Sequence, residues 1–91
     1  MGLTRAKEMR LLARQGHLEY TGSGAHASKR ELEVGDSVYL NCEGMLFAVR
    51  LTEHHHGKCR GVVCGYYNRE LFAGREIEFA TDNIYIVNKA N

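Results

Sequence analysis

The 91-residue sequence contains no proline, no tryptophan, only three cysteines and no long apolar run. A membrane-spanning helix needs about 20 apolar residues, so none is predicted. The odd number of cysteines and their spacing exclude the disulfide framework of a small secreted domain. Charges interrupt the first residues and leave no signal peptide. We therefore expect a cytoplasmic protein with free thiols.

Size and composition predict a single domain over residues 1–91. With 44% hydrophobic and 25% charged residues, the sequence is typical of a folded chain and not of a disordered one. The absence of proline is compatible with strands that all donate their backbone N–H groups to a sheet. Because no disulfide framework is present, the hydrophobic core has to supply most of the stability.

The net charge of +1 is divided unevenly along the chain. Residues 1–30 hold six basic and two acidic side chains, a balance of +4, whereas residues 31–91 hold six basic and nine acidic ones, a balance of −3. Such an asymmetry indicates a charged partner. The first part supplies the predicted electrostatic contact set, which comprises Lys7, Arg10, Arg14, Lys29 and Arg30.

Residues 1–16 have the pattern of a short, basic, amphipathic α-helix. Thr4 stands where an N-cap would be, and Gly16 stands where a helix would end. The apolar residues recur at offsets of three and four and would share one face: Ala6, Met9, Leu12 and Ala13. The cations at positions 7, 10 and 14 would line a stripe beside that face.

Residues 17–30 are predicted to form a short strand and a glycine-rich loop, and residues 31–91 a small β-barrel. Segments of β-strand character between turns predict about five strands, at 37–42, 45–53, 59–67, 76–79 and 84–87. The side chains expected to face the core are Val38, Leu40, Cys42, Met45, Phe47, Val49, Leu51, Ile77, Phe79, Ile84 and Ile86.

The glycines inside the third of these strands, Gly61 and Gly65, mark positions where it could bend or bulge. Rolling the sheet would pair most of its edges. This layout is similar in architecture to SH3-like small barrels. The predicted fold is therefore mainly β: a five-stranded SH3-like barrel or rolled antiparallel sheet, preceded by one short N-terminal helix.

The segment LTEHHHGKCRGVVCG (51–65) concentrates soft metal ligands. The spacing of Cys59 and Cys64 is not that of a common structural zinc site, and strand alternation would point them to opposite faces. We therefore expect no metal and no cofactor, with solvated histidines in a hairpin loop. Cys42 and Cys64 are predicted to be small buried side chains. The weaker alternative is a zinc site formed by His54, His56 and Cys59.

Catalysis is not predicted. A nucleophile beside an oriented base could be sought at Cys59 and His56. The glycine-rich loop region holds further candidates, namely His17, Ser23, His26 and Ser28. No carboxylate stands in an obvious orienting position, and a small barrel offers little concavity.

The predicted function is non-catalytic binding, with nucleic acid as the preferred partner. The basic set would contact phosphates, while Tyr39, Arg50 and Tyr85 on the barrel would face unpaired bases. The alternative is a protein–protein interaction or self-assembling module, whose helix docks onto an acidic protein surface or forms a homodimer. A zinc-stabilised module is the third possibility.

Overall fold

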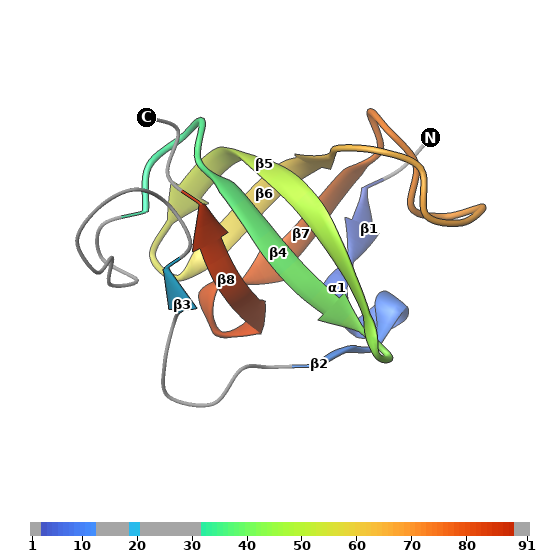
Figure 1. Cartoon of the computed structure of the whole chain (residues 1–91). Helices are drawn as coiled ribbons and strands as arrows, with labels where there is room; N and C mark the ends of the chain where they lie inside the picture. Colours follow the sequence, from blue (N-terminus) through green and yellow to red (C-terminus); the bar gives the residue numbers. More distant parts are fainter. Residues whose placement is uncertain (1–2, 13–18, 21–31, 89–91) are drawn as a thin grey trace.

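The computed structural model describes residues 3–12, 19–20 and 32–88, which are mainly β (Figure 1). The longer strands are β4 (Ser37–Cys42), β5 (Met45–His55), β6 (Lys58–Val63), β7 (Glu76–Ala80) and β8 (Ile84–Asn88). Three strands have two residues each: β1 (Thr4–Arg5), β2 (Leu11–Leu12) and β3 (Glu19–Tyr20). The helical elements are the single turn α1 (Ala6–Met9) and the 3-10 turn η2 (Thr81–Asn83).

All eight strands belong to one mixed sheet in the order β1-β7-β6-β5-β4-β8-β3, with β2 paired to the end of β4. The pairs β1–β7 and β3–β8 are parallel, and the other pairs are antiparallel. The sheet curls, so that β4 and β8 lie in front of β7 (Figure 1). Among the described residues β1 and β3 do not pair with each other, so a closed barrel is not confirmed.

The hairpins β4–β5 and β5–β6 each turn through two residues, Glu43–Gly44 and His56–Gly57. All four residues have positive φ, between 51° and 92°. This is the backbone of a type I′ turn, whose twist matches that of the flanking strands, and a glycine at the second position favours it. The hairpin predicted at the histidines is confirmed, but only His56 and Gly57 form its turn, and His54 and His55 lie in β5 instead of the loop.

Alternation along β4 and β5 places the predicted core side chains inside. Val38, Leu40, Phe47 and Val49 are each 0% exposed, and Ile77 of β7 is as well. Burying such a side chain contributes about 1.5–3 kcal/mol. The predicted faces of β4, β5 and β7 are therefore confirmed for their central residues.

The expected inward position of Ile86 is wrong. A β-bulge shifts the pairing of β8 from Tyr39–Ile86 to Leu40–Ile84. The extra residue reverses the alternation beyond it, so Ile84 and Val87 are 0% exposed while Ile86 is half-exposed. Because of this one inserted residue, Val87 lies in the core at the place expected for Ile86.

The predicted N-terminal helix is wrong. Residues 4–12 form a strand, a single helical turn and a second strand, and Arg10 (φ 54°) interrupts the helical backbone between α1 and β2. Thr4 is not an N-cap, because it lies in β1, is 8% exposed and accepts a hydrogen bond from Arg75. Pairing with the edges of β7 and β4 overrides the weak local preference for helix.

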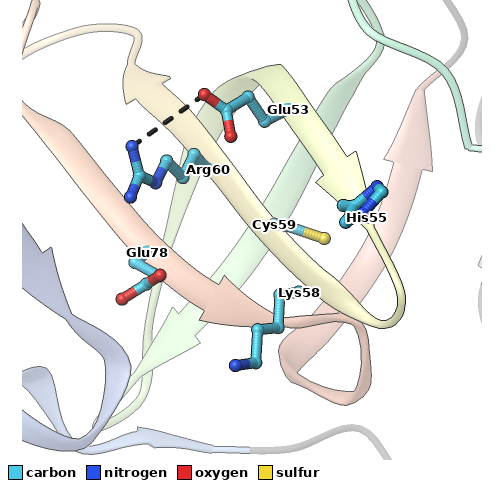
Figure 2. Close-up of a pocket in the computed structure, with 6 residues that line it drawn as sticks. All are labelled: Glu53, His55, Lys58, Cys59, Arg60 and Glu78. Carbon is cyan, nitrogen blue, oxygen red and sulfur yellow. Dashed lines mark ion pairs between the residues drawn. The ribbon is translucent and has the colours of Figure 1, made fainter.

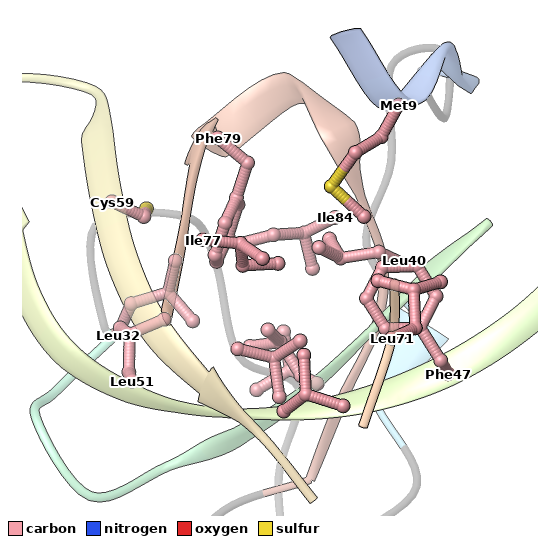
Figure 3. Packing of buried hydrophobic residues seen from close by; sticks show 14 residues of the cluster. Met9, Leu32, Leu40, Phe47, Leu51, Cys59, Leu71, Ile77, Phe79 and Ile84 are labelled. Carbon is pink, nitrogen blue, oxygen red and sulfur yellow. The ribbon is translucent and has the colours of Figure 1, made fainter. Parts of the chain in front are cut away.

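The core is continuous from the sheet to the N-terminal segment. Met9 extends from α1 into the cluster and lies close to Ile84 and Leu40 (Figure 3). Leu71, from the connection between β6 and β7, is 1% exposed, and Leu32 is 6% exposed. Met9 therefore covers part of the chain's own core.

The two glycines predicted as bends have different roles. Gly65 lies just beyond β6 with φ 116°. Gly61 lies inside β6, and a Cβ there would be 2.3 Å from Val49 Cγ1. The bulge that Gly61 indicated lies not in β6 but in the facing strand β5, where the register shifts between Leu51 and Glu53. Gly61 thus permits a close approach of β6 to β5.

Candidate nucleic-acid interface

The outer face of the sheet carries two of the three residues predicted to meet bases. Tyr39 of β4 pairs with Ala48 of β5 on one side and with Ile86 of β8 on the other. Ser37, two residues away on the same face, pairs with Arg50 of β5. Tyr39 and Arg50 are therefore diagonal neighbours, about 7 Å apart at the backbone.

The third residue, Tyr85, lies on the same face, at the bulge in β8. Ile84 and Val87 point into the core, and Tyr85 and Ile86 between them are both half-exposed. Both side chains therefore point outward beside Tyr39. Sequence alternation assigned Tyr85 to the outer face, and the bulge adds Ile86, an apolar neighbour that the sequence did not predict there.

Arg50 differs from its neighbouring arginines in having no carboxylate partner among the described residues. On the same outer face, Arg60 of β6 lies 3.9 Å from Glu53. Arg5 of β1 lies 3.6 Å from Glu78. Arg60 is also the register partner of Glu78 of β7. The two ion pairs therefore lie side by side and form a row of alternating charge across β5, β6, β7 and β1. Arg50 lies three residues before Glu53 in β5, and its exposed side chain is available to a ligand.

Most of the predicted basic set lies outside the described residues, as do the candidate nucleophiles and bases of the glycine-rich loop region. Lys7 lies in α1, whereas Arg14, Lys29 and Arg30 lie outside the described residues. Arg10 is 81% exposed at its side chain and lies 3.7 Å from Glu43. A surface pair of this kind contributes only about 0–1 kcal/mol, so Arg10 can exchange this partner for a phosphate.

A hollow of about 250 Å³ lies between α1, the β4–β5 turn and the loop before β7. Its wall contains three carboxylates, Glu8, Glu43 and Glu70, against one guanidinium, Arg10. Burial raises the pKa of Cys42 at this wall, and the nearby Glu43 and Glu70 raise it further. Among the described side chains, the wall of this hollow therefore holds more acidic than basic groups, which the charge count of residues 1–30 did not indicate.

The histidine hairpin does not assemble the alternative zinc site. His54 lies directly opposite Cys59, and His55 opposite Lys58, so successive histidines point to opposite faces. His56 occupies the turn. Among residues 3–12, 19–20 and 32–88, no group of three or more His, Cys, Asp or Glu side chains could hold a metal ion.

The three cysteines occupy different environments. Cys59 is 1% exposed, and burial raises its pKa, with its sulfur 3.9 Å from Thr81 Oγ1. Cys42 is half-buried and donates its S–H to the Met9 carbonyl at 2.7 Å. Cys64 is exposed, so its predicted burial is wrong. It follows the last residue of β6 and faces Ala48, to whose carbonyl its backbone N–H donates at 2.9 Å.

Tyr67 supports the outer face where β6 ends. Its hydroxyl accepts a hydrogen bond from the Ala48 backbone N–H at 3.1 Å and donates to the Cys64 carbonyl at 3.2 Å. Its ring packs edge-on against Phe47, with the centroids 6.0 Å apart. Because β6 ends at Val63, the Tyr67 hydroxyl takes the place of the strand carbonyl that would otherwise accept the hydrogen bond from the Ala48 N–H. No local pattern identifies this contact, because it spans an irregular loop.

Comparison with models of known protein families, with curated proteins and with solved structures finds no match to this chain. None of the helices in the described part of the chain has the length and apolar character needed to cross a membrane.

Proposed function

We propose that this chain is a non-catalytic module that binds nucleic acid with unpaired bases. The observation that carries the proposal is the gathering of Tyr39, Tyr85 and Arg50 on the outer face of β8, β4 and β5, where Arg50 has no carboxylate partner among the residues that the structure describes. Tyr39 and Tyr85 would stack on bases, and Arg50 would bind the phosphate between them. Base stacking on an aromatic side chain contributes about 1–3 kcal/mol per base.

The surroundings of these side chains favour a ligand that is both apolar and anionic. Ile86 is half-exposed beside Tyr39, and Leu46, two residues before Ala48 on the same face, is 40% exposed. Half-burial restricts the tyrosine rings before a ligand arrives, which reduces the entropy lost on binding. Arg10 and the basic residues near it in the sequence would contact the phosphates of a longer strand.

The curled sheet is part of this proposal. We propose that it is a variant of the SH3-like small barrel, because β4 to β8 enclose one core. The two-residue strands β1 and β3 stand at the edges that such a barrel would pair. In this arrangement the outer face of β8, β4 and β5 is the platform on which a strand could lie.

The test is fluorescence anisotropy of a short labelled single strand and of the matching duplex, titrated with the protein at several salt concentrations. Tyr39→Leu should weaken single-strand binding at least fivefold, since it removes one stacking platform while keeping an apolar side chain. Arg50→Ala should weaken binding and lower the salt slope by about 0.7, the share of one phosphate contact on a single strand. Arg69→Ala is the matched control, because Arg69 is an exposed arginine in the loop before β7.

No binding to either nucleic acid at low salt would remove the proposal. Equal losses for Arg50→Ala and Arg69→Ala would show that only total charge matters and not this face. Tighter binding to the duplex than to the single strand would contradict the stacking role of the tyrosines.

The second candidate is a protein-binding module, and exposed apolar side chains favour it. Val34 is 64% exposed, Tyr66 is 74% exposed, and Leu46 lies on the platform itself. Exposed aliphatic and aromatic side chains are characteristic of the centre of protein interfaces. The self-assembling form predicts a mass above that of the monomer in sedimentation at high concentration, reduced to the monomer by Leu46→Ser. A monomer at every concentration would exclude it.

A further inference from the structure

The side chains on the outer face of β8, β4 and β5 lie in two parallel rows that cross the strands. Register pairing aligns the first, which we call the polar row: Asn88, Ser37 and Arg50. Two residues away on each strand it aligns the second, the apolar row: Ile86, Tyr39 and Ala48. The rows are about 6.5 Å apart along the strands, because each residue of a strand advances by about 3.3 Å.

The polar row presents hydrogen-bonding groups that the fold does not use. Ser37 and Asn88 are half-exposed, and the buried neighbours Val38 and Val87 fix them on the outer face. Within residues 3–12, 19–20 and 32–88, neither side chain makes a hydrogen bond, and Arg50 has no carboxylate partner. A serine hydroxyl can donate and accept, and an asparagine amide can as well. These groups are therefore available to a ligand.

An unpaired nucleic-acid strand has the same division into two sides. Its sugars and phosphates form one side, and its bases, which stack on aromatic rings, form the other. A strand that crosses β8, β4 and β5 would therefore keep its backbone over the polar row and its bases over the apolar row. Tyr85, at the bulge beside Ile86, adds a second ring to that of Tyr39. The platform thus accommodates two consecutive nucleotides.

The opposite orientation, along the β-strands, is less favourable for phosphates. Beyond Arg50 the outer face of β5 reaches Glu53, which is ion-paired with Arg60 at 3.9 Å (Figure 2). A hollow of about 190 Å³ at this end is lined by acidic and basic side chains in equal number: Glu53, Glu78, Lys58 and Arg60. In the other direction the outer face of β5 continues with the apolar Ala48 and Leu46. A backbone is therefore better placed across the strands.

We propose that this platform selects RNA over DNA, with the 2′-hydroxyl of a ribose hydrogen-bonded by Ser37 and Asn88. The inference rests on the proposed function, because it requires an unpaired strand on the platform with a phosphate at Arg50. Ser37 and Asn88 continue the polar row from Arg50, along the line that the sugars would follow. The 2′-hydroxyl both donates and accepts, and it is the group by which proteins distinguish RNA from DNA. A deoxyribose would cover the two polar side chains without satisfying them.

The experiment compares labelled oligouridine with oligodeoxyuridine of the same length by fluorescence anisotropy at low salt. The two strands share the base and differ only in the 2′-hydroxyl. Wild-type protein should bind oligouridine at least about fivefold more tightly, the gain from one net hydrogen bond. Ser37→Ala should weaken oligouridine binding about fivefold and leave oligodeoxyuridine binding unchanged. Ser37→Thr keeps the hydroxyl and is the matched control, so it should retain the preference.

The outcomes separate this inference from the proposed function. Equal affinity of the wild type for both strands overturns the selectivity and leaves the platform standing. An equal loss on both strands in Ser37→Ala overturns the 2′-hydroxyl contact, because the serine then acts on a group that the strands share. No binding of either strand overturns both proposals. Melting curves establish that the variants are folded, and if Ser37→Ala is destabilised, Asn88→Ala at the end of β8 provides the same comparison.

Discussion

Replacing Gly61 by alanine should be one of the most destabilising single-methyl additions in this protein. The added Cβ would be 2.3 Å from Val49 Cγ1 and 2.7 Å from the backbone oxygen of Arg50. Carbon atoms in contact normally lie about 3.5–4.0 Å apart, so the first overlap exceeds 1 Å. Val49 could rotate at a cost of about 0.5–1.5 kcal/mol, but the backbone oxygen has no such freedom.

The strands β5 and β6 would therefore have to separate locally, in the middle of their ladder. Overpacking of this kind costs about 1–3 kcal/mol and sometimes more, and we expect the upper end, about 3 kcal/mol. For a domain of this size each kcal/mol corresponds to about 4–8 °C, so the melting temperature should fall by about 12–24 °C. Thermal and urea unfolding, followed by circular dichroism, measure both quantities.

Gly74→Ala is the control, because it separates crowding from backbone conformation. Gly74 has φ 92° and nothing within 4 Å of a built Cβ, so its alanine variant pays only the cost of the left-handed backbone, about 1–2 kcal/mol. Gly61 lies in an extended strand, so alanine there adds no left-handed backbone strain but places its Cβ too close to neighbouring atoms. If Gly61→Ala proves no more destabilising than Gly74→Ala, the close approach of β6 to β5 is not as the structure has it.

The remaining predictions concern Tyr67 and the cysteines. Tyr67→Phe keeps the ring but leaves the Ala48 N–H without its acceptor, so the free energy of unfolding should fall by about 1–2 kcal/mol in urea titrations; no change would mean that water replaces the hydroxyl. A maleimide should label Cys64 rapidly in the native protein and Cys59 only after unfolding, as peptide mass mapping would show; equal rates would refute the burial of Cys59. Because burial raises the pKa of Cys59 in the fold above the ordinary 9.0, the unfolded chain releases this proton first, and stability should decline as pH rises from 9.0 through the folded pKa. Cys59→Ala should show a shallower decline than the wild type, and an identical slope would assign the effect to other groups.

Residue alternation predicted the central strands because each buries one face only. In β4 and β5 the period of two is uninterrupted from Val38 to Leu40 and from Phe47 to Leu51, and every expected core residue there is buried. The same rule placed Tyr39 and Arg50 on the outer face. It failed at Ile86, because a bulge inserts a residue without any local signal.

The N-terminal segment shows why the rest could not be predicted. Apolar residues three and four apart are equally consistent with one helix and with two short strands around a helical turn. The choice depends on edges of β7 and β4 that exist only in the folded sheet. The pairing of Arg10 with Glu43 is likewise invisible in the sequence, since the two residues are 33 positions apart. The charge total of residues 1–30 therefore counted Arg10 without the carboxylate of Glu43 beside it.

The same N-terminal segment has a consequence for the order in which the protein can be completed during its synthesis. Thr4 of β1 pairs with Ile77 of β7, so β1 is synthesised well before the strand that it pairs with. Until then the hydrogen-bonding edge of the nascent strand is open to other chains, which is the situation in which strands associate wrongly. Because β1 has only two residues, it presents few backbone groups with which another chain could pair, and this limits wrong association before β7 is made.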